Sequence, residues 1–475
     1  MNEHVETLPT VDVPALNRMS LWAVALTCLV MLHGCMLAPH PDLPQETLPP
    51  LDQSALGAAG GIDPRSWWIQ FHDPVLNHLV DEALRNNLSL AEARQRLQQS
   101  RRELGSADLR YLPELHFQTQ NVTSASGIDT FVQFGFDSTW ELDIFGRKDS
   151  TLQLARGTQL SQISRQQAAE VSVIGDVVRG YLELRTAEQQ LQVLDHLAKL
   201  DQHWLSQLQR QQSLGLVTTQ AIHQAAEQNA HAQLSRSVWD TQKMQSAWRL
   251  ALLIGKLQPD PAWLITPTVA VQSELPLPPL PLSLLRSRPE IRQAEANIMQ
   301  TAGELGLAKA DLYPSLTLGF GYFFSSNETR NVTFYGELNS APTFGPVIDI
   351  PLFDWGRRKR HEEAMKAALQ ADLLAYRQSV RSAYVEVQSD LIALQGRSDI
   401  LKQQQSLLQG TSQSLQDETR KLALGLSSPL QLMRIQHDQD EQQLQLAEAR
   451  TRYDIAYIAL FKSLGGAALP QETRS

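Results

Sequence analysis

The chain carries the same order of features twice, and this duplication limits the folds open to it more than any other property. Three kinds of glycine-containing motif recur 210 residues apart: Gly146 and Gly356 in FGR-like motifs, Gly215 and Gly425 in Leu-Gly-Leu turns, and Gly255 and Gly465 at the ends of long polar runs. Three matched points at one offset are hard to obtain by chance. The sequence therefore predicts two structurally equivalent halves.

Upstream of these motifs the offset is shorter. LGSADLRYLPEL (104–115) and LGLAKADLYPSL (305–316) match at 201 residues, so one connection differs by nine residues between the halves. One comparison departs from the pattern, because GYLEL at Tyr181 best matches AYVEV at Tyr384, 203 residues later. Either the helices of the two repeats are shifted by one heptad relative to each other at this point, or the match is false.

Long helices are predicted in both halves. No proline occurs between Leu115 and Gln258, and from 352 to 469 only Pro429 does. The stretch from 150 to 213 carries a narrow apolar stripe, which is typical of a coiled coil. At the Leu-Gly-Leu turns glycine can adopt the left-handed conformation that ends a helix, and Ser428 and Pro429 suit the cap and first position of the next. We expect two long helical hairpins with tips at 214–216 and 424–426.

Each half also predicts a β-hairpin, at about 113–145 and 314–352. FVQFGFDSTWELDI (131–144) and PSLTLGFGYFF (314–324) alternate apolar with polar or small residues. Strands of about ten residues that are apolar on one face are what a transmembrane barrel requires. The edge of a soluble β-sandwich is the alternative.

The N-terminus predicts export from the cytoplasm. The run LWAVALTCLVML (21–32) has 12 apolar or near-apolar residues, too few to span a bilayer, and reads as a signal peptide. It ends in LHGC, which resembles the bacterial lipobox and would place a lipid on Cys35. A cleaved signal with a chance Gly-Cys is the alternative. By resemblance to known lipoproteins, Met36 after the cysteine favours the outer membrane. One lipid binds a membrane only marginally, so we expect a second attachment.

Composition and motifs exclude several classes of function. A net charge of −10 gives no basic surface for nucleic acid, and the two cysteines, Cys28 and Cys35, leave the body of the chain without a disulfide or thiolate metal site. None of the 12 histidines stands in a zinc-binding pattern such as HExxH, and no GxSxG or GxxxxGK[ST] occurs. We expect solvated histidines, no catalytic residues, no metal site and no cofactor other than a lipid on Cys35.

Motifs along nearly the whole expected mature chain resemble the TolC/OprM outer-membrane efflux channels, in the NodT-type lipoprotein branch. Each match is weak alone, but six occur in family order: the stretch Ser66–Arg101, STWELDIFGR, LLRSRPEIRQAE, LGLAKADLYPSL, PLFDWGR and LFKSLGG.

This resemblance implies a homotrimer of α+β membrane protomers. Each chain would give four strands to a 12-stranded outer-membrane barrel and long coiled-coil helices to a periplasmic α-barrel. The family's partners are a periplasmic adaptor protein and an inner-membrane pump of the RND, MFS or ABC class. The channel would conduct drugs or other small molecules passively to the exterior of a Gram-negative cell. The resemblance further implies that the tips contact the adaptor: Leu214, Gly215, Leu216, Leu424, Gly425 and Leu426.

The sequence departs from the family pattern at the expected periplasmic gate. Where the family has an LLDAQR-like stretch with a gate-forming aspartate, this chain reads LMRIQH, with Arg434 at the aspartate and His437 at the arginine position. Ala221 stands where the first half of family members commonly has an acidic residue. Leu430 is a further gate candidate. We hypothesise a neutral or basic, weakly cation-selective gate. The alternative is that Arg434 is solvated or forms an interhelical ion pair.

The expected organisation is therefore a signal peptide (1–34), a lipidated extended segment (35–65), a first repeat (66–258), a Pro-rich linker (259–282), a second repeat (283–466) and a tail (467–475). The alternative function is a lipid-anchored periplasmic adaptor. An adaptor would have one long helical hairpin flanked by small β domains, whereas this sequence predicts two hairpins and two strand pairs.

Overall fold

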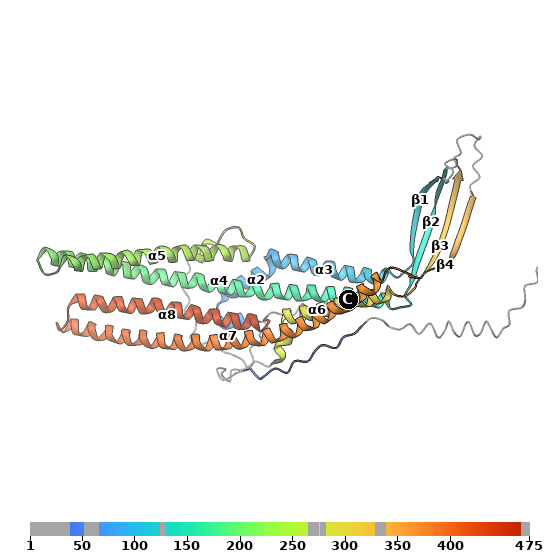
Figure 1. Cartoon of the computed structure of the whole chain (residues 1–475). Coiled ribbons are helices and arrows are strands. Elements are labelled where there is room, and N and C mark those ends of the chain that lie inside the picture. The colour runs from blue at the N-terminus through green and yellow to red at the C-terminus, as the bar shows by residue number, and fades with distance from the viewer. Residues whose placement is uncertain are drawn as a thin grey trace, which may run out of the picture. The chain divides into compact units, whose positions relative to one another are not determined.

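The computed structural model describes residues 39–51, 66–123, 130–264, 275, 282–327 and 339–466 (Figure 1). The expected signal peptide, Cys35 and the tail at 467–475 lie outside these ranges. No helix in the described ranges is both long and apolar enough to cross a membrane.

The helices repeat in length as well as in order. Helices α3 (Leu88–Leu109) and α6 (Pro289–Ala310) both have 22 residues. Helices α4 (Arg147–Ser213) and α7 (Arg357–Ala423) both have 67, and helices α5 (Thr219–Leu253) and α8 (Pro429–Ser463) both have 35. The equal lengths and matched offsets confirm the duplication predicted from the glycine motifs.

The match between Tyr181 and Tyr384, which departs from the common offset, is false. Helices α4 and α7 are equal in length and follow the offset of the glycine motifs at both of their ends, so neither contains a slip of one heptad. The two tyrosines also have different surroundings. The buried Tyr181 donates a hydrogen bond of 2.5 Å to Oδ2 of Asp73, whereas Tyr384 is more exposed and reaches the Pro50 carbonyl at 3.5 Å.

Shorter helices open each repeat. The first repeat opens with the 3-10 helix η1 (Trp67–Phe71) and α2 (Pro74–Asn86), and η3 (Leu282–Ser287) precedes α6. The Pro-rich linker lies mostly outside the described residues. A Pro-rich segment is not expected to be helical, but the described beginning of this linker forms one short 3-10 helix, η2 (Pro261–Leu264). Proline is compatible with the first turn of a helix, because that position needs no intrahelical amide donor.

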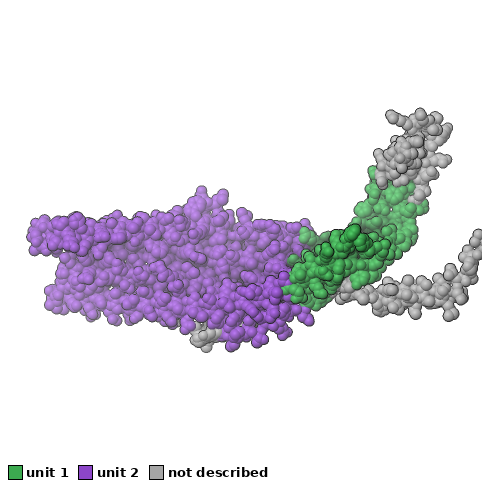
Figure 2. Space-filling view, in the orientation of Figure 1, with its two compact units in different colours: residues 1–41, 103–156, 299–370 green, residues 42–102, 157–298, 371–475 purple. Residues whose placement is uncertain are grey.

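The two compact units of the chain do not coincide with the two repeats (Figure 2). One unit comprises 1–41, 103–156 and 299–370, and the other comprises 42–102, 157–298 and 371–475. Each unit therefore combines equivalent parts of both repeats. The unit that contains the strands also contains the first turns of α4 and α7.

The strands form one antiparallel sheet in the order β1-β2-β3-β4 (Figure 1). Strands β1 (Glu114–Thr123) and β2 (Thr130–Leu142) make the first hairpin, and β3 (Ser315–Asn327) and β4 (Asn339–Asp349) make the second. Both hairpins fall within the expected ranges. The central β2–β3 pairing joins the two repeats, and within the described residues β1 and β4 each pair on one side only.

The register places most of the apolar residues of the four strands on one face, although Phe323 of β3 and Val347 of β4 lie on the other. Phe136 is opposite Phe117 on β1 and Tyr322 on β3, while Phe320 is opposite Phe344 on β4. Within the chain the four phenylalanines of this set are 44–78% exposed. Polar and small residues such as Gln118, Asp137 and Gly319 occupy the other face. An exposed aromatic face of this extent needs an apolar environment to cover it.

The helical unit, formed by 42–102, 157–298 and 371–475, is held together by contacts of α8 with η1 and of one helical hairpin with the other. The ring of Trp67 in η1 stacks on Phe461 of α8 with centroids 5.6 Å apart. Along the helices, Gln190 of α4 donates a hydrogen bond of 2.8 Å to the Leu444 carbonyl of α8. The core lies along these contacts, and it includes Val177, Val178, Leu184, Ala187, Tyr457, Ile458 and Leu460.

The matched glycines of the hairpin tips end their helices in the predicted way. Gly215 and Gly425 have φ values of 74° and 71°, in the left-handed region that glycine adopts without steric cost. Past each glycine, the amide of the next leucine donates to the carbonyl five residues back, at 2.9 Å and 2.8 Å. These bonds define Schellman motifs. Ser428 caps α8 through the amide of Gln431, and Pro429 is its first residue, as predicted.

Candidate functional site

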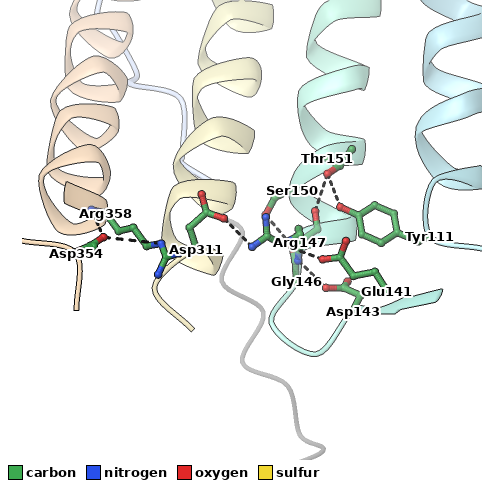
Figure 3. A network of polar contacts seen from close by, with 10 residues as sticks. All are labelled: Tyr111, Glu141, Asp143, Gly146, Arg147, Ser150, Thr151, Asp311, Asp354 and Arg358. Atoms are coloured by element: carbon green, nitrogen blue, oxygen red, sulfur yellow. Dashed lines mark hydrogen bonds and ion pairs between the residues drawn. The ribbon is translucent and has the colours of Figure 1, made fainter. Parts of the chain in front are cut away.

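Three parts of the chain hold motifs that either recur in both repeats or depart from the family pattern: the junction between sheet and helices, the hairpin tips, and the first turns of α8. The junction begins at Gly146, whose φ of 71° turns the chain from β2 into α4 (Figure 3). Asp143 accepts a hydrogen bond of 2.7 Å from the backbone amide of Arg147 and so satisfies one free donor at the start of the helix.

Arg147 connects the two repeats at this junction. Its guanidinium lies 3.3 Å from Glu141 at the end of β2 and 2.7 Å from Asp311 just past α6 (Figure 3). A cation at a helix N-terminus is disfavoured by the helix dipole. The surrounding carboxylates offset that cost, so the position is suited to a residue that binds several acidic partners.

The neighbouring Lys148 makes the corresponding contact with the end of α3. Its Nζ lies 2.8 Å from Asp108, and this hydrogen bond raises the pKa of Lys148. One turn along α4, Thr151 is 2.8 Å from the hydroxyl of Tyr111. The start of α4 is thereby attached to the ends of both α3 and α6.

The second repeat builds its junction differently. Asp354 accepts hydrogen bonds of 3.0 Å from the amides of Gly356 and Arg358, and these bonds lower its pKa, with the Arg358 amide contributing most. Arg357 is the residue equivalent to Arg147, but no side-chain ion pair is recorded for it within the described residues. The arginine contact is thus specific to the first repeat.

Both hairpin tips present their leucines to solvent. Leu214, Leu216, Leu424 and Leu426 are 70–74% exposed in the single chain. The second tip has an additional contact, because the Ser427 hydroxyl donates to the buried Glu418, which also lies 3.4 Å from Lys421. The Ser427 hydrogen bond is the main cause of the lowered pKa of Glu418. The equivalent position in the first hairpin is the buried Leu208, so the two tips are not identical.

The gate candidates lie near the starts of the return helices. Ala221 is in the first turn of α5, and its amide donates to the capping Thr218. Leu430 and Arg434 are in the first two turns of α8, and Arg434 is exposed, with no ion pair recorded among the described residues. His437 instead lies half-buried beside Asp201 of α4.

The expectation that the histidines are solvated is wrong at His437, whose side chain is half-buried. His196 is exposed as expected, but it also contacts a buried carboxyl group. His437 is 3.7 Å from Asp201, and Nδ1 of His196 is 2.5 Å from the buried Asp440. Burial is the main cause of the raised pKa values of both carboxyl groups. The sequence does not predict these α4–α8 pairs, because the members of each pair come from different repeats and no local spacing marks them.

Together, the amphipathic four-stranded sheet and the twin helical hairpins define the protomer of an outer-membrane channel that extends into the periplasm. Residues 79–256 and 280–466 match the family described as outer membrane efflux protein. This match spans most of the chain, so the protein belongs to that family.

Similar proteins cover almost the entire chain. The Escherichia coli "Cation efflux system protein CusC" is 25% identical over 452 residues, which are 92% of this chain and 96% of CusC. "Probable outer membrane lipoprotein SilC" of Salmonella typhimurium is 25% identical over 463 residues, covering 93% of this chain and 98% of SilC.

A similar fold is found in solved structures. The outer-membrane channel OprN superposes with a TM-score of 0.79 at 24% identity, covering 92% of this chain and all of OprN. The Campylobacter jejuni CmeC outer membrane channel gives a TM-score of 0.76 at 18% identity, covering 92% of this chain and 96% of CmeC. The chain is an outer-membrane efflux channel, and the adaptor alternative is not favoured.

We predict that Arg147→Ala lowers the free energy of unfolding by about 1 kcal/mol, because two partly exposed ion pairs at the junction are lost. The matched control is Arg357→Ala, which alters the equivalent residue in the second repeat and should leave the unfolding midpoint unchanged. Denaturant titration of the two purified variants measures both. Equal midpoints for the two variants would contradict the role assigned to Arg147.

Proposed function

We propose that three copies of this chain form a closed conduit that passively carries small molecules from a periplasmic adaptor and inner-membrane pump to the exterior. The observation that carries the proposal is the sheet, whose apolar face is exposed and whose two edge strands lack a second partner within the described chain. Four strands are too few to close a barrel, whereas 12 suffice, so neighbouring copies would satisfy both edges.

The helical unit supports assembly independently. Helix α5 carries an exposed apolar stripe, and α7 carries another. The stripes consist of Leu234, Val238, Met244, Trp248 and Leu252 on α5, and Leu374, Val385, Ile392, Ile400 and Leu407 on α7. Exposed apolar side chains repeated along a helix favour packing against another helix. Seams between protomers would cover them.

The proposal extends to the hairpin tips, the lipid and the partner pump. The exposed Leu-Gly-Leu tips would contact the adaptor, and a lipid on Cys35 would supplement the attachment through the barrel. The channel needs no catalytic residue and no cofactor besides that lipid. A partner pump of the RND, MFS or ABC class would determine the exported substrate.

The function is tested in a strain lacking the gene, exposed to drugs, metal ions and dyes. We expect increased sensitivity that the intact gene reverses and that Leu424→Asp with Leu426→Asp does not, because two charges would disrupt an apolar docking surface. Leu257→Asp is the control, since Leu257 is 91% exposed but lies away from the tips. Unchanged sensitivity of the deletion strain to every compound would contradict the export role.

The gate hypothesis is tested by single-channel recording in bilayers. With Arg434 exposed near the start of α8, three copies would place positive charge at the entrance, so we expect weak cation preference that Arg434→Ala increases. Arg397→Ala on α7 is the control. Strong cation preference in the unaltered channel that Arg434→Ala leaves unchanged would contradict the hypothesis.

A further inference from the structure

Around the gate candidate His437, α8 gathers three side chains able to bind a metal ion. Ligand atoms of His437, Asp438 and Glu441 all lie within 4.8 Å of one another. His437 and Glu441 are four residues apart and therefore share a helix face, with Nδ1 of the histidine 3.7 Å from Oε1 of the glutamate. A group of exposed acidic residues is common on protein surfaces, so the grouping alone does not indicate a metal.

A buried carboxylate behind the histidine gives the cluster a more specific meaning. Asp201 of α4 is only 3% exposed, and its Oδ1 lies 3.7 Å from Nε2 of His437. Its Oδ2 is buried and has no hydrogen-bond partner in the described structure. An unpaired buried carboxylate oxygen is costly, and here the carboxylate faces the imidazole nitrogen opposite the one that faces Glu441.

An imidazole between a surface ligand set and a buried carboxylate is a recurring arrangement in metalloproteins. One ring nitrogen binds the metal, while the other donates its proton to the carboxylate, which fixes the tautomer and orientation of the ring. We propose that His437, Asp438 and Glu441 bind a divalent first-row transition-metal ion, with Nδ1 of His437 as the nitrogen ligand and Asp201 as a positioning residue.

The ligand chemistry selects the class of metal. One imidazole with two carboxylates suits Zn²⁺, Ni²⁺ or Cu²⁺, whereas Mg²⁺ and Ca²⁺ prefer oxygen ligands alone. Metal bonds of about 2.0–2.2 Å require the ligand atoms to move closer together. Asp438 and Glu441 are exposed and able to rotate inward, and water would complete the coordination. At 3.7 Å the Nε2–Oδ1 contact between His437 and Asp201 is too long for a hydrogen bond. Because a metal-bound imidazole is a stronger proton donor, loading the site would draw these two atoms into hydrogen-bond distance.

The chain offers a matched comparison on α5. His231 and Glu227 are also one turn apart, with Nε2 and Oε1 separated by 4.0 Å and both side chains 73% exposed. Glu227 is the one partner recorded for His231 in the described structure, so no buried carboxylate orients this ring. The proposal predicts metal binding at His437 and none at His231.

The test is a Zn²⁺ titration of the intact chain, purified in detergent, against a chromophoric chelator. We expect one Zn²⁺ per chain, affinity about 100-fold weaker in His437→Gln, and affinity about 10- to 100-fold weaker in Glu441→Gln and Asp201→Asn. His231→Gln should bind as the unaltered chain does. The metal-free unfolding midpoint of Asp201→Asn should stay close to that of the unaltered chain, which separates positioning of the ligand from a structural role.

Two results would overturn the metal site: an unaltered chain that binds Zn²⁺ no better than Glu441→Gln, or His231→Gln weakening binding as much as His437→Gln. Glu441 is exposed, so its variant should fold even where His437→Gln does not. Unchanged Zn²⁺ affinity in Asp201→Asn would overturn the positioning role. The titration measures binding alone, so its failure would leave the channel function standing.

Discussion

The rest of the structure depends on a sheet that a single chain cannot complete. In the described chain each of its two outer strands pairs with a neighbour on one side only, so the backbone donors and acceptors along the other side have no strand to pair with. Its aromatic face is also exposed. In a membrane every such backbone group must be satisfied, because no water is available to replace the missing hydrogen bond. Association of copies through β1 and β4 would solve both problems, since it closes the sheet and places the aromatic face against lipid.

The duplication explains how one chain provides both a membrane sheet and long periplasmic helices. Each repeat supplies one strand pair and one helical hairpin, and β2–β3 pairing joins the repeats in the sheet. At the start of α4 the connection is reinforced by Arg147, which contacts a carboxylate from each repeat. The repeats have nevertheless diverged. The capping aspartate is Asp143 in the first junction and the non-equivalent Asp354 in the second, and the second tip adds Glu418.

Much of this fold was predictable because its signals are local. Glycine marks the left-handed helix ends, the Ser428-Pro429 pair marks a helix start, and two-residue alternation marks the strands and their apolar faces. The contacts between Arg147 and Asp311 and between His437 and Asp201 were not predictable. Their partners come from different repeats, and only the folded chain brings them together. The false match between Tyr181 and Tyr384 has a different cause. A helix with a heptad pattern resembles itself when it is shifted by one heptad, so sequence similarity alone does not fix the alignment of the two repeats.

The most direct test of the account is disulfide cross-linking between the two sheet edges in the outer membrane. One cysteine replaces His116 on β1, and a second replaces Thr343 or Val347 on β4. Within one chain these strands are separated by three strand spacings, about 14 Å, which is too far for a disulfide. The account predicts covalently linked species of up to three chains on oxidation, and none with either cysteine alone. Chains that remain monomeric with every cysteine pair would contradict it.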